Sequence, residues 1–269
     1  MLFDVCSDLH VDLFASGIDS VDFHALKNTG SDVLVIAGDV SNHFYLSRRV
    51  LDRACKEYKH VVFVDGNHET YEMGDDISDA ELEMHDYCRS EANLTYLPRD
   101  DYKIGGTVFI GTNGWYDWSI MCPLYSKAAQ FDAWKRMSND RFLFSEIPID
   151  ERAFRAAEDL RNRVAKLDAD ELVTEIVIVT HTVPLVTLLE HRTHDSEYQK
   201  LSGSYGNSNM SAILGSKKIK AWVYGHTHNR KLVVYSGVQF VNNARGYEFE
   251  ETGKWWMVQM NSAEEDLRF

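Results

Sequence analysis

The stretch Val33-Leu34-Val35-Ile36-Ala37-Gly38-Asp39 begins with five uncharged residues, three of them β-branched, and ends with a glycine and an aspartate. Such a run predicts a short strand that is buried on both faces. It is followed by a helix-like stretch at about 44–58, with apolar residues three and four apart, and by a second apolar run at 61–64. Strand, helix and strand in this order predict a layered α/β fold.

Other short apolar runs extend this pattern along the chain. We expect strands at 2–6, 108–110, 176–179, 221–224, 238–241 and 255–258, and further helices at about 77–91 and 150–167. The last strands follow one another with only turns between them, so part of the sheet should be antiparallel or mixed. The sequence contains no internal repeat, low-complexity tract or linker, which favours a single domain over residues 1–269.

The composition is that of an ordinary globular protein, with 44% hydrophobic and 26% charged residues. The net charge of -14 argues against general binding of nucleic acid, because that needs clustered Lys and Arg side chains. The four cysteines form no CxxC pair, so neither a zinc knuckle nor a disulfide framework is indicated.

The N-terminal residues lack the basic and long apolar regions of a signal peptide. No apolar run approaches the roughly 20 residues that a membrane span needs. We therefore expect a cytoplasmic protein that does not bind membranes, and the sequence gives no indication of its oligomeric state.

Side chains that can bind metal ions follow five of the expected strands. The segments are Asp8-Leu9-His10, Gly38-Asp39, Gly66-Asn67-His68-Glu69, His181 and Gly225-His226-Thr227-His228. Ligand sites of open α/β sheets form at the carboxyl ends of strands, so we expect these side chains to meet. Two of the segments place side chains two residues apart, and on an extended chain such pairs point to the same side.

Each segment also has a simpler interpretation when it is taken alone. The first and last can be ordinary turns, residues 66–69 can be a Gly-Asn turn with a helix cap, and His181 can be a structural histidine. If all five segments were such turns, caps or structural residues, they would have to occur by chance in the order of a two-metal site. Together the segments therefore favour a two-metal site for phosphoester hydrolysis.

With these motifs in this order, the sequence resembles the calcineurin-like metallophosphoesterase superfamily, whose signature is DxH, GD, GNH[DE], a strand-end His and GHxH. The resemblance extends from Asp8 to His228. It implies an α/β fold built as a four-layer αββα sandwich, in which two mixed β-sheets are flanked by helices. The metals would lie between loops at the strand ends.

The resemblance implies that seven residues bind two divalent metal ions. Asp8, His10 and His228 would hold the first ion, Asn67, His181 and His226 the second, and Asp39 would bridge them. Two such ions about 3.5–4 Å apart can clamp phosphoryl oxygens and convert a bridging water into a hydroxide nucleophile. Four imidazoles, one amide and two carboxylates suit Mn²⁺, Fe, Zn²⁺ or Ni²⁺ better than Mg²⁺ or Ca²⁺.

The resemblance also implies catalytic roles. Besides Asp39, His68 would be catalytic, as the general acid that protonates the leaving group during in-line attack, and Glu69 would orient a ligand or His68. Asn67 and Arg245 are the candidate substrate-binding residues, because a guanidinium can pair with phosphate oxygens. His43, Tyr71, His191 and His194 are further candidates that can equally be surface or structural residues.

Departures from the family pattern bear on the substrate. After Asp39 the chain reads Val-Ser-Asn-His, without the arginine that marks the protein Ser/Thr phosphatases of this superfamily. We therefore expect a small phosphoester substrate, with a diester slightly preferred over a monoester. Residues 111–115 together with Asn139-Asp140, and residues 242–247, resemble segments of a group of uncharacterised bacterial phosphoesterases.

The stretch 115–145 is rich in aromatic residues. It can form a partial cap that stacks on a flat part of the substrate, or a side helix that buries its rings in the core. Two rival functions also remain open. One is a nuclease of the same superfamily, which the acidic composition disfavours. The other is a non-catalytic metal-binding scaffold, which the presence of all seven ligand positions and His68 disfavours.

Overall fold

The buried run that follows Asp32 forms strand β2 (Val33–Ala37). Successive side chains of a strand point to opposite faces. Val35 lies in the core between two sheets, whereas Leu34 and Ile36 lie in the core beneath a layer of helices. Both faces of β2 are therefore covered, as the uncharged sequence predicts.

The computed structural model describes residues 1–72, 76–122, 124–189, 195–250 and 255–262. Its first sheet has the strand order β11-β1-β2-β3-β4. The remaining strands of this sheet are β1 (Leu2–Cys6), β3 (His60–Val64), β4 (Leu94–Tyr96) and β11 (Val258–Asn261). Strands β1 to β4 are parallel, and β11 pairs antiparallel with β1.

The second sheet has the order β5-β6-β7-β8-β10-β9. Its strands are β5 (Tyr102–Ile104), β6 (Thr107–Thr112), β7 (Glu175–Thr180), β8 (Ile219–Tyr224), β9 (Lys231–Tyr235) and β10 (Val238–Asn242). The central strands are parallel, and β5 and β9 are antiparallel edge strands. Both sheets are thus mixed, which confirms the prediction from the closely spaced late strands.

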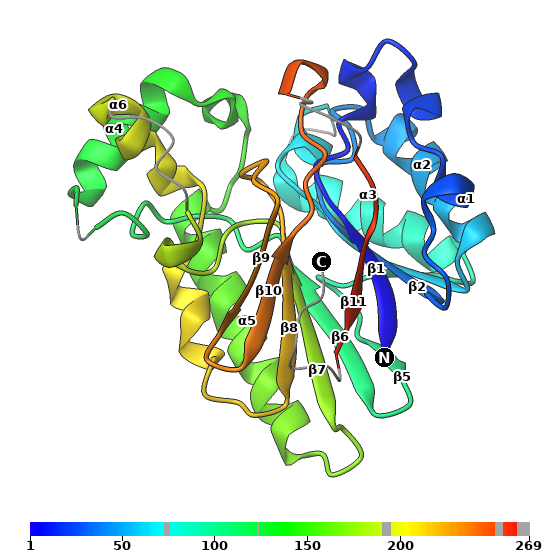
Figure 1. Ribbon diagram of the computed structural model, residues 1–269. Coiled ribbons are helices and arrows are strands. Elements are labelled where there is room, and N and C mark those ends of the chain that lie inside the picture. The colour runs from blue at the N-terminus through cyan, green and yellow to red at the C-terminus, as the bar shows by residue number, and fades with distance from the viewer. Residues whose placement is uncertain (73–75, 123, 190–194, 251–254, 263–269) are drawn as a thin grey trace.

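Helices cover the outer faces of the two sheets (Figure 1). On the first sheet lie α1 (Phe23–Leu26), α2 (Phe44–Glu57) and α3 (Ile77–Ser90), and on the second lies α5 (Ile149–Ala169). Two shorter helices, α4 (Lys127–Met137) and α6 (Ser196–Leu201), contact each other beside the second sheet. The result is the predicted four-layer αββα sandwich. None of the helices in the described ranges combines the length and the apolar character that a membrane span requires.

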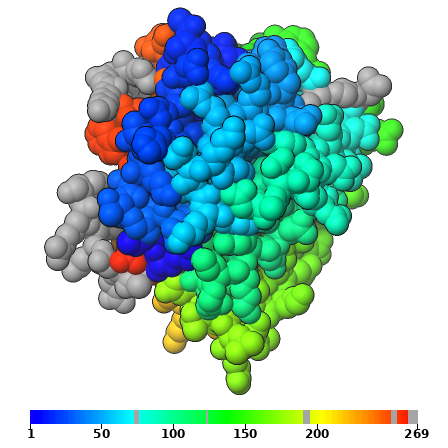
Figure 2. Space-filling view, turned by 90° about the vertical axis from the view of Figure 1, so that its right-hand side faces the viewer, coloured from blue at the N-terminus to red at the C-terminus, as the bar shows by residue number. Residues whose placement is uncertain are grey.

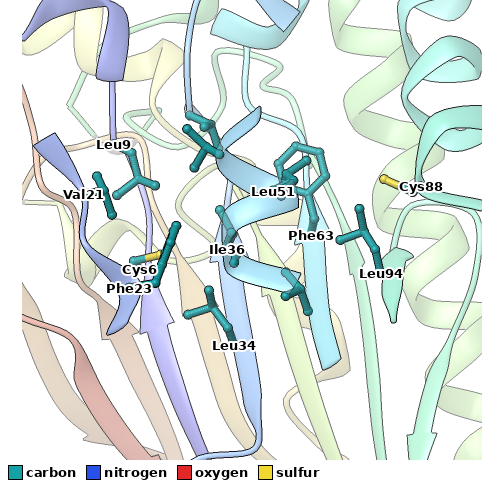
Figure 3. Packing of buried hydrophobic residues seen from close by; sticks show 14 of the residues in the cluster. Cys6, Leu9, Val21, Phe23, Leu34, Ile36, Leu51, Phe63, Cys88 and Leu94 are labelled. Carbon is teal, nitrogen blue, oxygen red and sulfur yellow. The ribbon is translucent and has the colours of Figure 1, made fainter. Parts of the chain in front are cut away.

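Packing on the first sheet shows how the layers are held together. Figure 3 shows Leu34 and Ile36 of β2, Phe63 of β3 and Leu51 of α2 in one apolar cluster. Burying one such side chain contributes about 1.5–3 kcal/mol. Figure 2 views the molecule from this side, where the N-terminal part of the chain, in blue and cyan, forms most of the upper surface.

One predicted strand is displaced along the chain. The apolar run at 255–258 predicts a strand, but β11 begins only at Val258, which pairs with Val5 of β1. Before that point the Asn243 side-chain amide donates to the main-chain oxygens of Val5 (2.7 Å) and Trp256 (3.2 Å). This side chain occupies the place of further strand pairing, so residues 255–257 do not join the sheet, although they alternate between buried (Trp255, Met257) and exposed (Trp256) positions.

Candidate metal centre

The five motifs meet at one end of the sandwich, where strands of both sheets end. Asp8, Asp39 and Asn67 follow β1, β2 and β3 of the first sheet, and His181 and His226 follow β7 and β8 of the second. The loops are joined here by main-chain hydrogen bonds, such as that from Gly246 N to the main-chain oxygen of Asp8 at 3.0 Å. The site is therefore built from both sheets.

The first group of possible ligands consists of Asp8, His10, Asp39 and His228, whose ligand atoms all lie within 4.8 Å of one another. The Nε2 atoms of His10 and His228 are 3.0 Å apart, and His228 Nε2 is 3.5 Å from Asp8 Oδ1. Two nitrogen ligands about 2.1 Å from one ion, at a right angle, would be separated by about 3 Å. The spacing of the two rings therefore fits a shared ion.

The second group consists of Asp39, His181 and His226. His181 Nε2 is 3.3 Å from Asp39 Oδ2 and 3.1 Å from His226 Nδ1. The Asn67 amide oxygen lies 3.1 Å from the same His181 nitrogen, which adds a neutral oxygen to the set. This spacing also fits a single ion.

Asp39 belongs to both groups through one oxygen. Its Oδ2 faces His10 at 3.8 Å and His181 at 3.3 Å, whereas its Oδ1 accepts the main-chain N–H of His68 at 3.0 Å. The shared position follows from the strand order, because β2 lies in the middle of the first sheet. Asp39 is thus placed to join two metal sites.

The backbone at the site is held in an unusual conformation. Positive φ angles occur at five of the seven predicted ligands, namely Asp8 (51°), His10 (42°), Asp39 (57°), His226 (71°) and His228 (47°). A positive φ is uncommon for residues other than glycine and is maintained only where the surrounding structure enforces it. The fold therefore stores backbone strain at the strand ends where these side chains converge.

Two motif glycines are required by close approach of the loops. A Cβ atom on Gly66 would lie 2.0 Å from Asp39 Oδ1, and one on Gly225 would lie 2.7 Å from Asp8 Oδ2. Any side chain at these positions would displace a carboxylate of the metal centre. The glycines of the GNHE and GHTH motifs thus have a steric role.

Most of the imidazoles are oriented by a hydrogen bond from the ring nitrogen that does not face the proposed ion. His181 Nδ1 donates to the Ala37 oxygen at 2.9 Å, and His226 Nε2 donates to the Ser204 oxygen at 3.2 Å. His228 Nδ1 donates to Glu250 Oε2 at 2.6 Å. Such contacts fix the tautomer and leave the other nitrogen free to bind a metal. In the described part of the chain, His10 Nδ1 has no such partner.

Glu69 organises the loops around Asp39 and the GNHE motif. Its fully buried carboxylate accepts the main-chain N–H groups of Asp39 (2.9 Å), Val40 (2.6 Å) and Gly66 (2.7 Å). Burial raises the pKa of Glu69 to about 7, the neighbouring Asp39 adds to this effect, and the amide donors oppose it. The predicted orienting role of Glu69 is thus directed at the main chain rather than at the ring of His68.

The electrostatic environment favours cations. Burial lowers the pKa of His10 to about 3 and that of His226 to about 4, so both rings are neutral at neutral pH and offer a lone pair. Burial acts in the same direction on His181, but Asp39 outweighs it and raises the pKa of that ring to about 10. The carboxylates therefore favour positive charge where metal ions would lie.

His68 is placed beside the two groups. Its Nδ1 donates to Asn42 Oδ1 at 2.5 Å, and its Nε2 lies 3.7 Å from Asp39 Oδ2. The His68 side chain is 11% exposed and forms one wall of a cavity of about 390 Å³, which is also lined by Asp39, Asn67 and His226. A group bound over the metal centre would therefore contact His68 Nε2.

No role was predicted for Asp140, which the structure brings to the candidate metal centre. Its Oδ1 accepts a hydrogen bond from Asn67 Nδ2 at 2.9 Å and one from the Tyr71 hydroxyl at 2.6 Å. Its Oδ2 accepts one from the Tyr116 hydroxyl at 2.7 Å. The only signal in the sequence was the resemblance of residues 139–140 to a segment of related proteins.

The aromatic stretch 115–145 contributes to the site through its polar turn. Trp115, Tyr116, Trp118 and Trp134 pack with residues of α3 and α5 in a separate apolar cluster. Residues 138–140, at the end of the stretch, line the cavity instead. The rings named here thus form a core, while the turn forms one wall of the cavity.

Arg245 is directed away from the cavity. Its guanidinium lies over the Phe14 ring at 3.4 Å and donates to Ser20 Oγ at 2.8 Å. It does not contribute to the cavity walls in the described part of the chain. We therefore do not assign Arg245 to substrate binding.

Of the other residues predicted as possible substrate contacts, only some line the cavity in the described part of the chain. Tyr71 lines the cavity, whereas His43 hydrogen-bonds to Glu72 and is absent from the described cavity walls. His191 and His194 lie outside the described residues.

Comparisons with known proteins agree with this geometry. The sequence matches the calcineurin-like phosphoesterase family over residues 1–230. An uncharacterised protein of Acanthamoeba polyphaga mimivirus is 26% identical over 262 residues, which cover 91% of this chain and 90% of that protein. The structure of the phosphopantetheinyl hydrolase PptH from Mycobacterium tuberculosis matches with a TM-score of 0.78 at 22% identity, over 96% of this chain and 95% of that one. The last likeness shows a shared fold. The chain belongs to the calcineurin-like phosphoesterase family and is a metal-dependent phosphoester hydrolase.

Proposed function

We propose that the protein hydrolyses a small phosphodiester at a dinuclear metal centre. The proposed ligands are Asp8, His10 and His228 for one ion and Asn67, His181 and His226 for the other, with Asp39 shared by both. The observation that supports this proposal most strongly is the position of Asp39 Oδ2, which faces imidazoles of both groups. A carboxylate that bound only one ion would not need to face the ligands of the other ion.

The residues around this centre divide the chemistry among them. Two bound ions would supply an activated water and neutralise charge on the phosphoryl oxygens. His68 Nδ1–H donates to Asn42 Oδ1, which orients the ring, and in the doubly protonated ring Nε2–H is the group that donates a proton to the leaving oxygen. The water would lose one proton on activation; as its oxygen bonds to phosphorus, the bond to the leaving oxygen breaks, and that oxygen takes the proton of His68 Nε2.

A diester is preferred because of the charge on the cavity walls. In the described part of the chain, neither Lys nor Arg lines the cavity, whereas Asp140 and Glu250 do. A monoester has up to two negative charges near neutral pH, and a diester has one. Without a protein cation to balance the additional charge, the walls favour the diester.

Phosphopantetheinyl esters are the natural substrate class that we would test first. PptH shares the fold over 96% of this chain, and its name specifies hydrolysis of a phosphopantetheinyl group. This suggestion rests on the fold alone, so it gives a starting point for a substrate search.

The proposal is tested by comparing bis-nitrophenyl phosphate with nitrophenyl phosphate on the Mn²⁺-loaded protein. We expect faster turnover of the diester. In the Asp39→Asn variant, kcat should fall by at least about 100-fold, because the shared charge that holds both ions is removed. Metal content, measured in parallel by elemental analysis, should fall from about two ions per chain.

Asp132→Asn is a matched control, because this side chain is 60% exposed and, within the described part of the chain, forms an ion pair only with Lys135. It should keep both activity and metal content. Exclusive turnover of the monoester would identify a phosphatase instead. Full activity with unchanged metal content in Asp39→Asn would refute the dinuclear assignment.

A further inference from the structure

A second cavity, of about 590 Å³, adjoins the one over the metal centre. The two cavities share four wall residues, His68, Tyr71, Asn139 and Tyr247. The rings of Tyr71 and Tyr247 lie 4.6 and 6.5 Å from the ring of His68. His68 therefore stands at the junction of the two cavities.

The remaining walls of the second cavity are mainly apolar. Leu13, Phe142, Leu143 and Phe249 line it, and no Asp, Glu, Lys or Arg side chain from the described residues does. Phe142 is 75% exposed and Phe249 is 84% exposed. Large apolar side chains gathered around one hollow at the surface indicate a binding site more often than a structural need.

Two of these rings are held in place by neighbours. Phe249 stacks on Tyr247 with centroids 5.4 Å apart, and the Arg141 guanidinium covers one face of the Phe142 ring at 4.4 Å. Arg141 itself donates to the main-chain oxygens of Arg136 and Ser138. The aromatic wall is thus pre-arranged, which lowers the cost of ordering it around a ligand.

The position of His68 defines which part of a substrate would enter this cavity. The proposed ligands Asp39, Asn67, His226 and His228 line only the first cavity, so the phosphorus would lie there. The acid must be within hydrogen-bonding distance of the leaving oxygen. The substituent on that oxygen therefore extends past His68 into the second cavity.

We propose that the second cavity is a leaving-group subsite for an uncharged aromatic or otherwise apolar alcohol. This inference rests on the proposed phosphodiesterase activity and names the class of diester. The substituent that remains on phosphorus would stay in the first cavity, whose walls include Ser138, Gln199 and Asn229. A suitable substrate thus has one apolar and one polar substituent.

The test uses two methyl diesters with leaving groups of similar acidity, methyl 1-naphthyl phosphate and methyl 4-carboxyphenyl phosphate. The retained group is the same, so a difference in kcat/KM reports contacts of the leaving group. On the Mn²⁺-loaded full chain we expect the naphthyl ester to be preferred. The preference should fall by about 10-fold in Phe142→Ser, through a higher KM for the naphthyl ester, because an aromatic contact is lost.

Phe154→Ser is the matched control, because Phe154 is 55% exposed on α5 and lines neither cavity. It should leave the preference unchanged. Phe249→Ser tests the opposite wall and should reduce the preference as Phe142→Ser does.

The outcomes separate the two proposals. If both diesters are hydrolysed equally well, or if the preference survives in both Phe142→Ser and Phe249→Ser, the subsite is refuted while the phosphodiesterase stands. If the metal-loaded protein hydrolyses no diester, the proposed function is refuted, and the subsite with it.

Discussion

Asp140 determines which way the Asn67 amide faces. Its carboxylate holds the Asn67 nitrogen at 2.9 Å, and the amide oxygen is thereby turned towards His181 Nε2, 3.1 Å away. Asp140 is itself fixed by the hydroxyl of Tyr116. It is therefore a positioning residue, which acts on a proposed metal ligand without binding the ion.

Replacing Asp140 by Asn tests this role, because the new amide can present a donor where the Asn67 nitrogen needs an acceptor. We expect Mn²⁺ affinity to fall by about 10–100-fold, as is usual when a partner of a metal ligand is lost. Titration of Mn²⁺ against kcat would measure the loss, and excess Mn²⁺ should restore much of the activity. Unchanged Mn²⁺ dependence would show that Asn67 needs no such support.

At the scale of single residues, the sequence indicated the strand-end side chains but not their supports. Strand periodicity and the motifs were enough to predict that Asp39 and His181 would meet. Asp140 and Glu250 lie in short 3₁₀ helices that are too short to show a periodic pattern, and only the folded chain brings them to Asn67 and His228. Arg245 was predicted to bind substrate because of its charge, but its guanidinium packs on the Phe14 ring instead.

At the scale of elements, Arg152 ties α5 to the start of α3. The side chain is 6% exposed, and its guanidinium lies 3.2 Å from carboxylate oxygens of both Asp76 and Glu81. It also donates to Ser78 Oγ and Ser145 Oγ, each at 2.6 Å. A buried cation with these partners stabilises the junction of the helices, because its loss would leave the carboxylates of Asp76 and Glu81 without the cation buried beside them.

We expect Arg152→Met to lower the free energy of unfolding by about 3–5 kcal/mol, since one partner of a buried ion pair is removed. Urea unfolding followed by circular dichroism would measure the change. Arg155→Met is the control, because Arg155 is 58% exposed, its pair with Glu151 lies on the surface, and such a pair contributes at most about 1 kcal/mol. Equal losses in both variants would contradict the role of burial.

The longer helices could be predicted because their apolar spacing is regular. The predicted helix at 77–91 corresponds to Ile77–Ser90, and the one at 150–167 corresponds to Ile149–Ala169. The sequence of 115–145 does not distinguish helix α4 from a cap, because aromatic residues throughout the stretch obscure the apolar spacing of a helix. Ser126, whose side chain accepts from Ala129 N, was the available start signal.

At the scale of the whole molecule, the candidate metal centre joins the two sheets. The first sheet supplies the carboxylates and Asn67, and the second supplies three of the four proposed imidazole ligands, with His10 as the exception. Periodicity alone indicated layers of helix and strand, whereas the division into two sheets came from the family resemblance. A short edge strand such as β5 has only three residues, too few to reveal the sheet to which it belongs.

The most direct test of the central claim is anomalous diffraction from crystals of the Mn²⁺-loaded protein. We expect two peaks about 3.5–4 Å apart, on either side of Asp39 Oδ2. One should contact Asp8, His10 and His228, and the other Asn67, His181 and His226. A single peak at full Mn²⁺ loading, or two peaks that do not share Asp39, would contradict the dinuclear centre.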